Sequence, residues 1–256
     1  MCHPSDGQHE ARRATEGTNR ACGIVPFMEL ETRWLGRLDY RSGWALQHEL
    51  VAARAGGTIP DQLLLLEHPA VLTLGRQSDE GHILASAEEL ERRGIDVIRV
   101  ERGGEVTYHG PGQLVAYPIV KLADRGLLIR PFVRALEQAM IDTAEAFGVA
   151  ATRRDGHPGI WCDAAGANPR KLGALGLRIE RGVSYHGVAL NITTDLADFD
   201  LIDPCGMPAA EVTSIARELA WAAEEAVPST SSVARAGGVF AQALSAALGE
   251  RMVVAA

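Results

Sequence analysis

The sequence predicts an α+β fold in which helices flank a mixed or antiparallel sheet. Segments rich in strand formers and bounded by Gly, Pro or Asp outnumber those with helical periodicity. The two kinds do not alternate regularly, as they would in a doubly wound parallel sheet. With 256 residues, 46% of them hydrophobic, the chain can bury a large core without disulfides.

The predicted helices cover residues 41–55, 86–94, 130–148 and about 231–249. Ser86 and Glu89 have the spacing of an N-terminal capping box. Pro131 lies in the first turn of the longest helix, and Gly148 ends it. Apolar residues recur along one side of that helix, which indicates one buried face.

The predicted strands cover residues 61–68, 70–76, 96–101, 112–120, 149–155, 159–162, 172–179 and 183–193. Residues 1–23 are polar and lack a periodic apolar pattern, so we expect a disordered N-terminal tail. Residues 24–256 are then expected to form a single domain, although this length also allows two.

Composition excludes several classes of protein. A formal net charge of −8 argues against a nucleic-acid surface as the main partner. No apolar stretch approaches the roughly 20 residues that span a bilayer, and the N-terminus has no apolar run typical of a signal peptide. The four cysteines show no paired spacing, so we expect free thiols and a cytoplasmic protein.

Residues 102–119, RGGEVTYHGPGQLVAYPI, place glycines among strand formers. Glycine within a strand marks either a bulge or a close approach to the backbone, so this stretch contains either two hairpin turns or a binding groove. Arg102 and His109 favour a groove for a carbonyl or an anion. His109 alone would more often be a hydrogen-bonded structural residue.

Lys171 is one of only two lysines, the other being Lys121, in a chain that otherwise uses arginine for positive charge. A desolvated ammonium can lose its proton and act as a base, whereas a guanidinium cannot. Most lysines are solvated surface residues. Lys171, however, precedes LGALGL, whose small residues would let another chain segment or a ligand approach the backbone.

Cys205 lies between Pro204 and Gly206, so it is expected on a turn. A cysteine displayed on a turn is incidental, disulfide-bonded, a metal ligand or a nucleophile. A lysine able to take its proton would make it an acyl-transfer nucleophile. Cys162, in a predicted strand, is expected to be a packing residue.

These segments together resemble the octanoyltransferases of lipoate biosynthesis, the lipoate biosynthesis protein B family. The resemblance runs from about residue 63 to 215 and rests on LLEHPAVLTLGR, RGGEVTYHGPGQLVAYPI, HPGIW, KLGALGLRI, SYHGVALNI and PCG followed by VTSI. It implies the fold of the biotin/lipoate protein ligase catalytic domain, with a ligase-like core at about 57–243.

The resemblance also implies roles for residues. Cys205 would accept the octanoyl group, and Lys171 would lower the pKa of its thiol and handle the proton. The substrate site would be lined by Arg102, Gly103, Gly104, Glu105, Val106, Thr107, Tyr108, His109, Ala174, Leu175, Gly176, Gly187, Val188 and Ala189. No metal or other cofactor is implied.

The implied reaction moves an octanoyl group from octanoyl-acyl carrier protein, the donor, to a lysine of a lipoyl domain. The implied acceptors are the lipoyl domains of 2-oxoacid dehydrogenase complexes and the glycine cleavage H protein. No nucleic acid or membrane partner is expected.

Three alternatives stay open at this stage. An ATP-dependent lipoate or biotin ligase would use the same fold but would not need Cys205. A non-enzymatic acyl-binding module would bind acyl groups without a covalent step. A metal site of Cys205, His109 and His186 lacks the short ligand spacing of structural zinc sites. If Lys171 only anchored its strand, His109, His186 or backbone dipoles would remain to activate Cys205.

Overall fold

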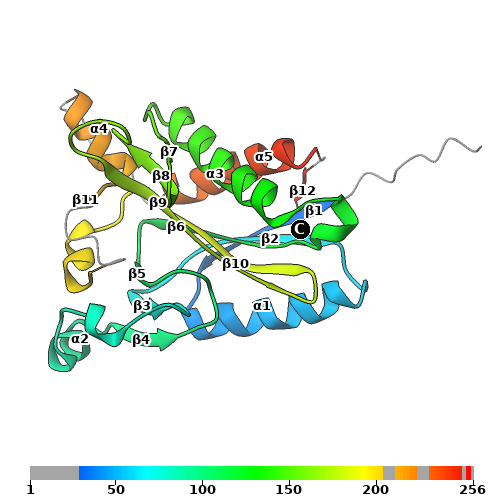
Figure 1. Cartoon of the computed structure of the whole chain (residues 1–256), viewed down its shortest axis with the longest axis horizontal. Coiled ribbons are helices and arrows are strands. Elements are labelled where there is room, and N and C mark those ends of the chain that lie inside the picture. Colours follow the sequence, from blue (N-terminus) through cyan, green and yellow to red (C-terminus); the bar gives the residue numbers. More distant parts are fainter. Residues whose placement is uncertain (1–28, 204–210, 224–230, 250–251, 255–256) are drawn as a thin grey trace, which may run out of the picture.

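The computed structural model describes residues 29–203, 211–223, 231–249 and 252–254. Its main feature is a mixed sheet whose strands follow the order β12-β1-β2-β6-β10-β9-β8-β7, with β11 paired to β9 (Figure 1). A smaller sheet has the order β4-β3-β5. The predicted α+β class with a mixed sheet is therefore confirmed.

The centre of the main sheet is antiparallel. It consists of β2 (Asp61–Glu67), β6 (Gln113–Ile119), β10 (Val183–Asn191), β9 (Arg170–Glu180), β8 (His157–Cys162) and β7 (Thr152–Arg154). Parallel pairs lie at its margins: β1 (Leu30–Arg37) with β2, β12 (Met252–Val254) with β1, and β11 (Glu211–Val212) with β9. In β2, β6 and β10 every residue is buried, which explains why most of their residues are apolar.

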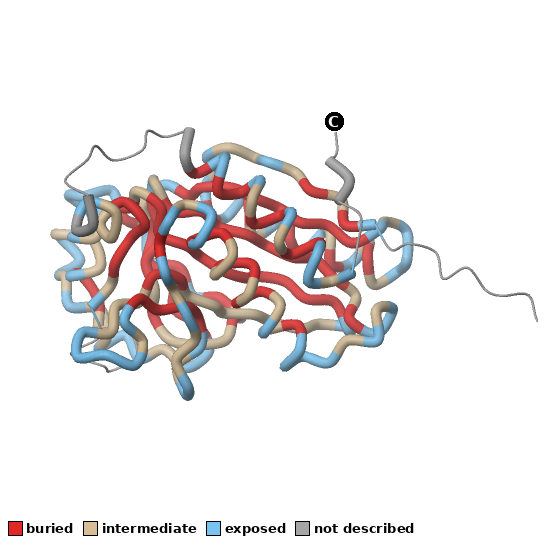
Figure 2. Tube along the Cα trace, turned by 90° about the horizontal axis from the view of Figure 1, so that it is seen from above, coloured by how far each residue is buried: buried red, intermediate tan, exposed pale blue. Residues whose placement is uncertain are grey.

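Helices cover both faces of the sheet (Figure 1). α3 (Ile129–Ala146) and α5 (Ser231–Ala247) pack together on one face, near α4 (Ile215–Ala223). α1 (Tyr40–Ala55) lies on the other face against β6 and β10, beside the small sheet of β3 (Val71–Leu74), β4 (Asp96–Arg99) and β5 (Val106–His109). Buried residues form a continuous band between these layers (Figure 2).

All four predicted helices are present, with ends within two residues of the prediction. α2 (Ala87–Arg93) begins where the Ser86 hydroxyl accepts a hydrogen bond from the Glu89 N–H, and it ends on left-handed Gly94. The Glu89 carboxylate pairs with Arg92 and Arg93 on the same helix.

Several elements were not predicted. β1 has only two buried residues, Leu30 and Thr32, so its sequence lacks a strand signal. α4, the two-residue β11 and three short 3₁₀ helices, Glu80–His82, Leu122–Arg125 and Leu196–Leu201, were also missed. The predicted tail, residues 1–23, lies outside the described residues.

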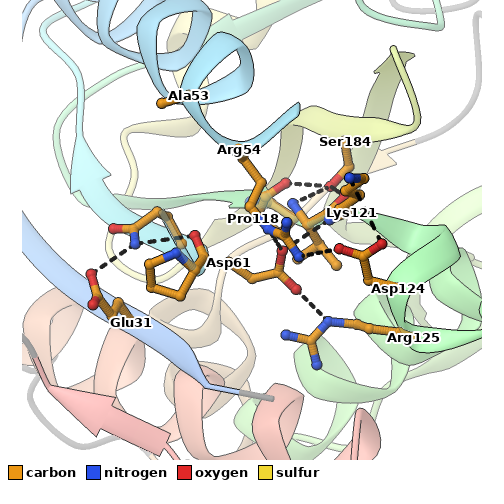
Figure 3. A network of polar contacts seen from close by, with 12 residues as sticks. Glu31, Ala53, Arg54, Asp61, Pro118, Lys121, Asp124, Arg125 and Ser184 are labelled. Atoms are coloured by element: carbon orange, nitrogen blue, oxygen red, sulfur yellow. Dashed lines mark hydrogen bonds and ion pairs between the residues drawn. The ribbon is translucent and has the colours of Figure 1, made fainter. Parts of the chain in front are cut away.

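A buried charge network joins the C-terminal end of α1 to the start of β2 (Figure 3). The side chain of Asp61 is fully buried and pairs with Arg54 and Arg125, while its Oδ1 accepts the Lys121 N–H at 3.0 Å. Arg54 also reaches Asp124 at 2.9 Å. These contacts fix α1, which carries part of the cavity described next, against the sheet.

Candidate active site

One cavity lies on β9 and β10, on the face of the sheet that α1 and the small sheet cover. Its lining on β9 extends from Lys171 to Gly176, and on β10 from His186 to Asn191. Its empty volume is about 850 Å³, including the part open to solvent. The wall is completed by Arg102, by Gly104 to Thr107 and by His109, together with Tyr40, Gln113, Tyr117, Phe199 and Val212.

The structure brings nearly all of the predicted site residues to this cavity. Of the described ones, only Gly103 and Tyr108 do not line it. The Gly103 N–H donates to the Leu177 carbonyl at 2.9 Å, which ties the loop to β9. Tyr108 packs in a separate apolar cluster, and its hydroxyl donates to Asp198 at 2.6 Å.

At two glycines of the cavity, the backbone of a neighbouring segment lies where a side chain would begin. A Cβ on Gly176 would lie 2.8 Å from the Gly103 carbonyl oxygen, and one on Gly187 would lie 2.0 Å from that of Ala116. Substitution at either would force backbone apart, because Cβ atoms do not approach that closely. The expected close approach is therefore made by the protein's own chain at these two positions.

Arg102 is buried and anchored. Its guanidinium donates to the Thr73 carbonyl at 2.6 Å and to the Thr73 hydroxyl at 2.9 and 3.1 Å. A further hydrogen bond reaches the Gly103 carbonyl at 3.1 Å. These bonds hold a positive charge in the cavity wall, where it stabilises negative charge on a ligand.

A chain of buried amides orients His109. Asn191 donates through Nδ2 to the Thr213 carbonyl at 3.0 Å, and its Oδ1 accepts from Gln113 Nε2, also at 3.0 Å. Gln113 Oε1, an acceptor only, lies 2.7 Å from His109 Nδ1, so that nitrogen carries the proton. Burial lowers the pKa of His109 to about 3, which leaves a neutral ring with a lone pair on Nε2.

Lys171 lies at the end of the cavity beside β11. Its backbone carbonyl accepts the Thr213 N–H at 3.0 Å, and Val212 is its parallel strand partner. Its ammonium lies 5.2 Å from the centre of the Trp161 ring, within cation–π distance. The neighbouring Arg170 forms two 2.8 Å hydrogen bonds with the Glu218 carboxylate, which hold α4 beside this strand.

Cys205 lies outside the described residues, but both flanks of its segment are described. Before it, the Asp203 N–H donates to the His82 carbonyl at 2.8 Å. After it, Glu211 and Val212 pair with Arg170 and Lys171.

Cys162 is buried in the main core, as expected for a packing residue, and burial raises the pKa of its thiol to about 12. Such a thiol is a poor nucleophile at neutral pH.

Eight lining residues were not in the predicted set: Tyr40, Gln113, Tyr117, Gly173, His186, Asn191, Phe199 and Val212. Gln113 could have been predicted, because it is a polar residue next to the apolar sequence LVAYPI. No group of three His, Cys, Asp or Glu side chains suited to a metal occurs in the described part of the chain. No helix there is long and apolar enough to cross a membrane.

Comparison with known folds shows close structural likeness to lipoate protein ligases. A putative lipoate protein ligase from T. acidophilum with bound lipoic acid superposes with a TM-score of 0.64 over 89% of each chain, at 14% identity. P. falciparum LipL1 in complex with lipoate gives 0.60 over 88% of this chain and 65% of that one, at 12% identity. At these identities the likeness establishes the fold alone.

Sequence comparison is more specific. Residues 39–234 match the lipoyl protein ligase A/B catalytic domain. An octanoyltransferase of Acidobacterium capsulatum is 49% identical over 75% of this chain and 81% of its own length. An octanoyltransferase of Chloroflexus aurantiacus is 44% identical over 83% and 94% respectively. The chain therefore belongs to the octanoyltransferase family and is an acyltransferase of lipoate biosynthesis.

Proposed function

We propose that this acyltransferase moves an octanoyl group from octanoyl-acyl carrier protein to a lysine of a lipoyl domain, through a thioester on Cys205. The acceptors are the lipoyl domains of 2-oxoacid dehydrogenase complexes and the glycine cleavage H protein. The observation that carries the proposal is the pairing of β11, which directly follows the Cys205 segment, with β9 at Lys171, where the cavity begins.

The first step exchanges one thioester for another. The Cys205 thiolate attacks the octanoyl carbonyl, the bond to the carrier sulfur breaks, and the carrier thiol leaves with a proton. Because a thioester replaces a thioester, the step is nearly balanced in free energy and needs no ATP. Lys171 takes the proton from Cys205, and its positive charge then favours the thiolate.

The second step forms an amide. The acceptor lysine must lose a proton before its amine attacks the octanoyl-Cys205 carbonyl, and the C–S bond then breaks to release the Cys205 thiolate. Lys171 removes the amine proton, so one residue serves both half-reactions. The replacement of a thioester by an amide makes this step downhill.

The cavity walls suit an acyl chain. Ala174, Leu175, Val188 and Ala189 present an apolar surface between Lys171 and the inner end. Burial of a chain there contributes about 0.8 kcal/mol per methylene, which favours octanoyl over short acyl groups by several kcal/mol. Residues 104–107 form another part of the lining.

The direct test is intact-mass analysis after the protein is mixed with octanoyl-carrier protein in the absence of ATP. We expect one octanoyl adduct that hydroxylamine removes and that peptide mapping assigns to Cys205. Cys205→Ser should abolish the adduct. The matched variant Cys162→Ser should keep it, because that thiol is buried in the core. An adduct at another residue would refute the thioester mechanism.

Two further outcomes distinguish the alternatives. Formation of product only with ATP, together with nucleotide binding, would identify a ligase. Tight octanoyl binding that never becomes covalent would identify an acyl-binding module.

A further inference from the structure

At the Lys171 end of the cavity, a buried tryptophan contacts a cation from the strand on each side of it. Trp161 is on β8, whose neighbours in the sheet are β7 and β9 (Figure 1). From β9, the Lys171 ammonium lies 5.2 Å from the centre of the Trp161 ring, and from β7 the Arg154 guanidinium lies at the same distance. The Trp161 Nε1 donates to the His157 carbonyl at 3.2 Å, which fixes the ring. Trp161 therefore holds Arg154 close to Lys171.

Strand geometry explains why Trp161 and Lys171 share a face of the sheet. Ile160 and Cys162, which flank Trp161 on β8, both point into the main core. Because successive side chains of a strand point to opposite faces, Trp161 points to the face that carries the cavity. The pairing of β8 with β9 is irregular between Ile160 and Trp161, and this irregularity makes Lys171 the strand partner of Trp161. The arrangement is thus built into the register of three neighbouring strands.

Arg154 differs from the neighbouring arginines in its partners. Each of the others donates to a carboxylate at 2.6–3.1 Å: Arg153 to Glu137, Arg170 to Glu218 and Arg217 to Glu211. Among the residues that the structure describes, no carboxylate forms an ion pair with Arg154, not even that of Asp155 beside it in the sequence. Arg154 is partly exposed, and a guanidinium on an aromatic ring keeps its N–H donors available. It is therefore an uncompensated positive charge, fixed near Lys171.

The distance from Arg154 to Lys171 matches the reach of an acceptor lysine. Each charged group lies 5.2 Å from the same ring centre, so the two are at most about 10 Å apart. The proposed mechanism brings the acceptor amine to Lys171. A lysine side chain spans about 6 Å from Cα to Nζ, so the residues next to the acceptor lysine lie within about 10 Å of that amine. The donor instead presents its thioester at the end of a carrier arm, which keeps the carrier's own side chains farther away.

We propose that Arg154, supported by the Trp161 ring, binds an acidic side chain next to the acceptor lysine and so selects lysines with acidic neighbours. The proposal rests on the acyl-transfer function proposed above and names a residue that recognises its acceptor. An acidic neighbour would pair with the Arg154 guanidinium. A basic neighbour would be repelled by it. Because the pair would be partly exposed, its effect is that of a surface ion pair and is best measured as a preference between acceptors.

The experiment uses three versions of one lipoyl domain, with Glu, Gln or Arg at the position before the acceptor lysine. The protein is first loaded with octanoyl from octanoyl-carrier protein and separated from the carrier. Transfer to each version is then followed by intact mass. For the wild-type protein we expect the second-order rate constant to be about five-fold higher with the Glu version than with the Gln version, and lowest with the Arg version. In about 0.5 M NaCl the differences should shrink, because salt screens exposed charges.

Charge substitutions then test the residue. Arg154→Glu should reverse the order, so that the Arg version becomes the fastest acceptor, and Arg154→Gln should make the three versions nearly equal. Arg130→Glu is the matched control, because it makes the same charge change at an exposed arginine of α3, on the other face of the sheet. It should keep the wild-type order. The readout is a ratio of acceptors within one protein, so an effect of a substitution on Lys171 or on folding cancels.

The outcomes separate this inference from the proposed function. If the wild-type protein transfers octanoyl to all three versions equally, or if Arg154→Glu keeps the wild-type order, the role of Arg154 is refuted and the proposed function stands. An unchanged order together with slower loading of Cys205 would also refute it, because Arg154 would then serve the carrier protein instead. If no version of the lipoyl domain is octanoylated, both proposals fail.

Discussion

Lowering the pH from 7.5 to 5.5 should destabilise the folded chain by about 4 kcal/mol. Burial is the largest cause that lowers the pKa of His68 to about 4 and those of His109 and His186 to about 3. In the unfolded chain each imidazole has a pKa of about 6.5. Between these values the unfolded state binds protons that the folded state does not bind, so stability falls as the pH falls.

The magnitude follows from linkage. Across this interval each of the three histidines contributes about 1.3 kcal/mol, because the unfolded ring titrates fully while the folded ring stays neutral. Carboxylates with a lowered pKa, such as Glu218, lose their contribution only below a pH of about 4.5. The chosen interval therefore isolates the histidines. A loss of this size is a large share of the 5–15 kcal/mol of stability typical of a folded protein.

The assay is urea unfolding of the full chain at pH 7.5, 6.5 and 5.5 and constant ionic strength. His68→Gln should reduce the pH dependence by about one third. Glutamine can still donate toward the Leu38 carbonyl, 2.6 Å from His68 Nδ1, without titrating. A free energy of unfolding that changed by less than about 1 kcal/mol in the wild-type protein would show that these rings are not buried as neutral groups.

Three other perturbations test the charge network, the strand contacts and the chemistry. Asp61→Asn should lower the free energy of unfolding, measured with a chemical denaturant, by about 3–5 kcal/mol, because two buried guanidinium groups lose the carboxylate that they share. Asp124→Asn should lower it by less than about 1 kcal/mol, because the side chain of Asp124 is 37% exposed. Gly187→Ala should lower the free energy of unfolding by more than about 2 kcal/mol, because the new Cβ would overlap the Ala116 carbonyl. Gly238→Ala should change it by less than about 1 kcal/mol, because nothing lies within 4 Å of the new Cβ. Equal effects of the two substitutions would contradict the packing described here. Lys171→Arg keeps the charge but cannot take a proton, so turnover at neutral pH should fall about 10²- to 10⁴-fold and partly recover toward pH 9; wild-type turnover across this range would exclude a base role.

The central strands could be predicted from the sequence because their burial requires many apolar residues within a short stretch of the chain. Strands β2, β6 and β10 are buried along their whole length, and most of their residues are apolar. β1 escaped prediction because it is half-exposed, and its pairing with β2 and β12 is a contact between distant segments. Strand order likewise depends on long-range packing, which no local pattern encodes.

The site was predictable where a residue type was unusual for its place. Lys171 is unusual because the chain otherwise uses arginine for nearly all of its positive charge, and the glycines at 103–104 and 176 are unusual because they lie among strand-forming residues. The amide chain through Gln113 and Asn191 was not predictable, because it depends on the register of β6 with β10. The left-handed backbone conformation of His186, with a φ of +54°, is likewise invisible in a sequence, since it arises from the contact with Gln47 on α1.

The histidines of the cavity bear on how Cys205 is activated. A base works best when its pKa lies near the operating pH, whereas His109 and His186 both have a pKa of about 3. A thiol has an ordinary pKa of about 8.5 and a lysine amine one of about 10.4, so either proton transfer to these imidazoles would be uphill by more than 5 pKa units. They can accept or donate hydrogen bonds as neutral rings, but they cannot hold the proton from Cys205 or from the acceptor amine. Lys171 is therefore favoured over the two histidines as the proposed base. His109→Gln, which keeps a hydrogen-bonding group, should then leave the pH profile of octanoyl transfer unshifted. A shifted profile, measured as kcat/KM from pH 6 to 9, would return the base role to His109.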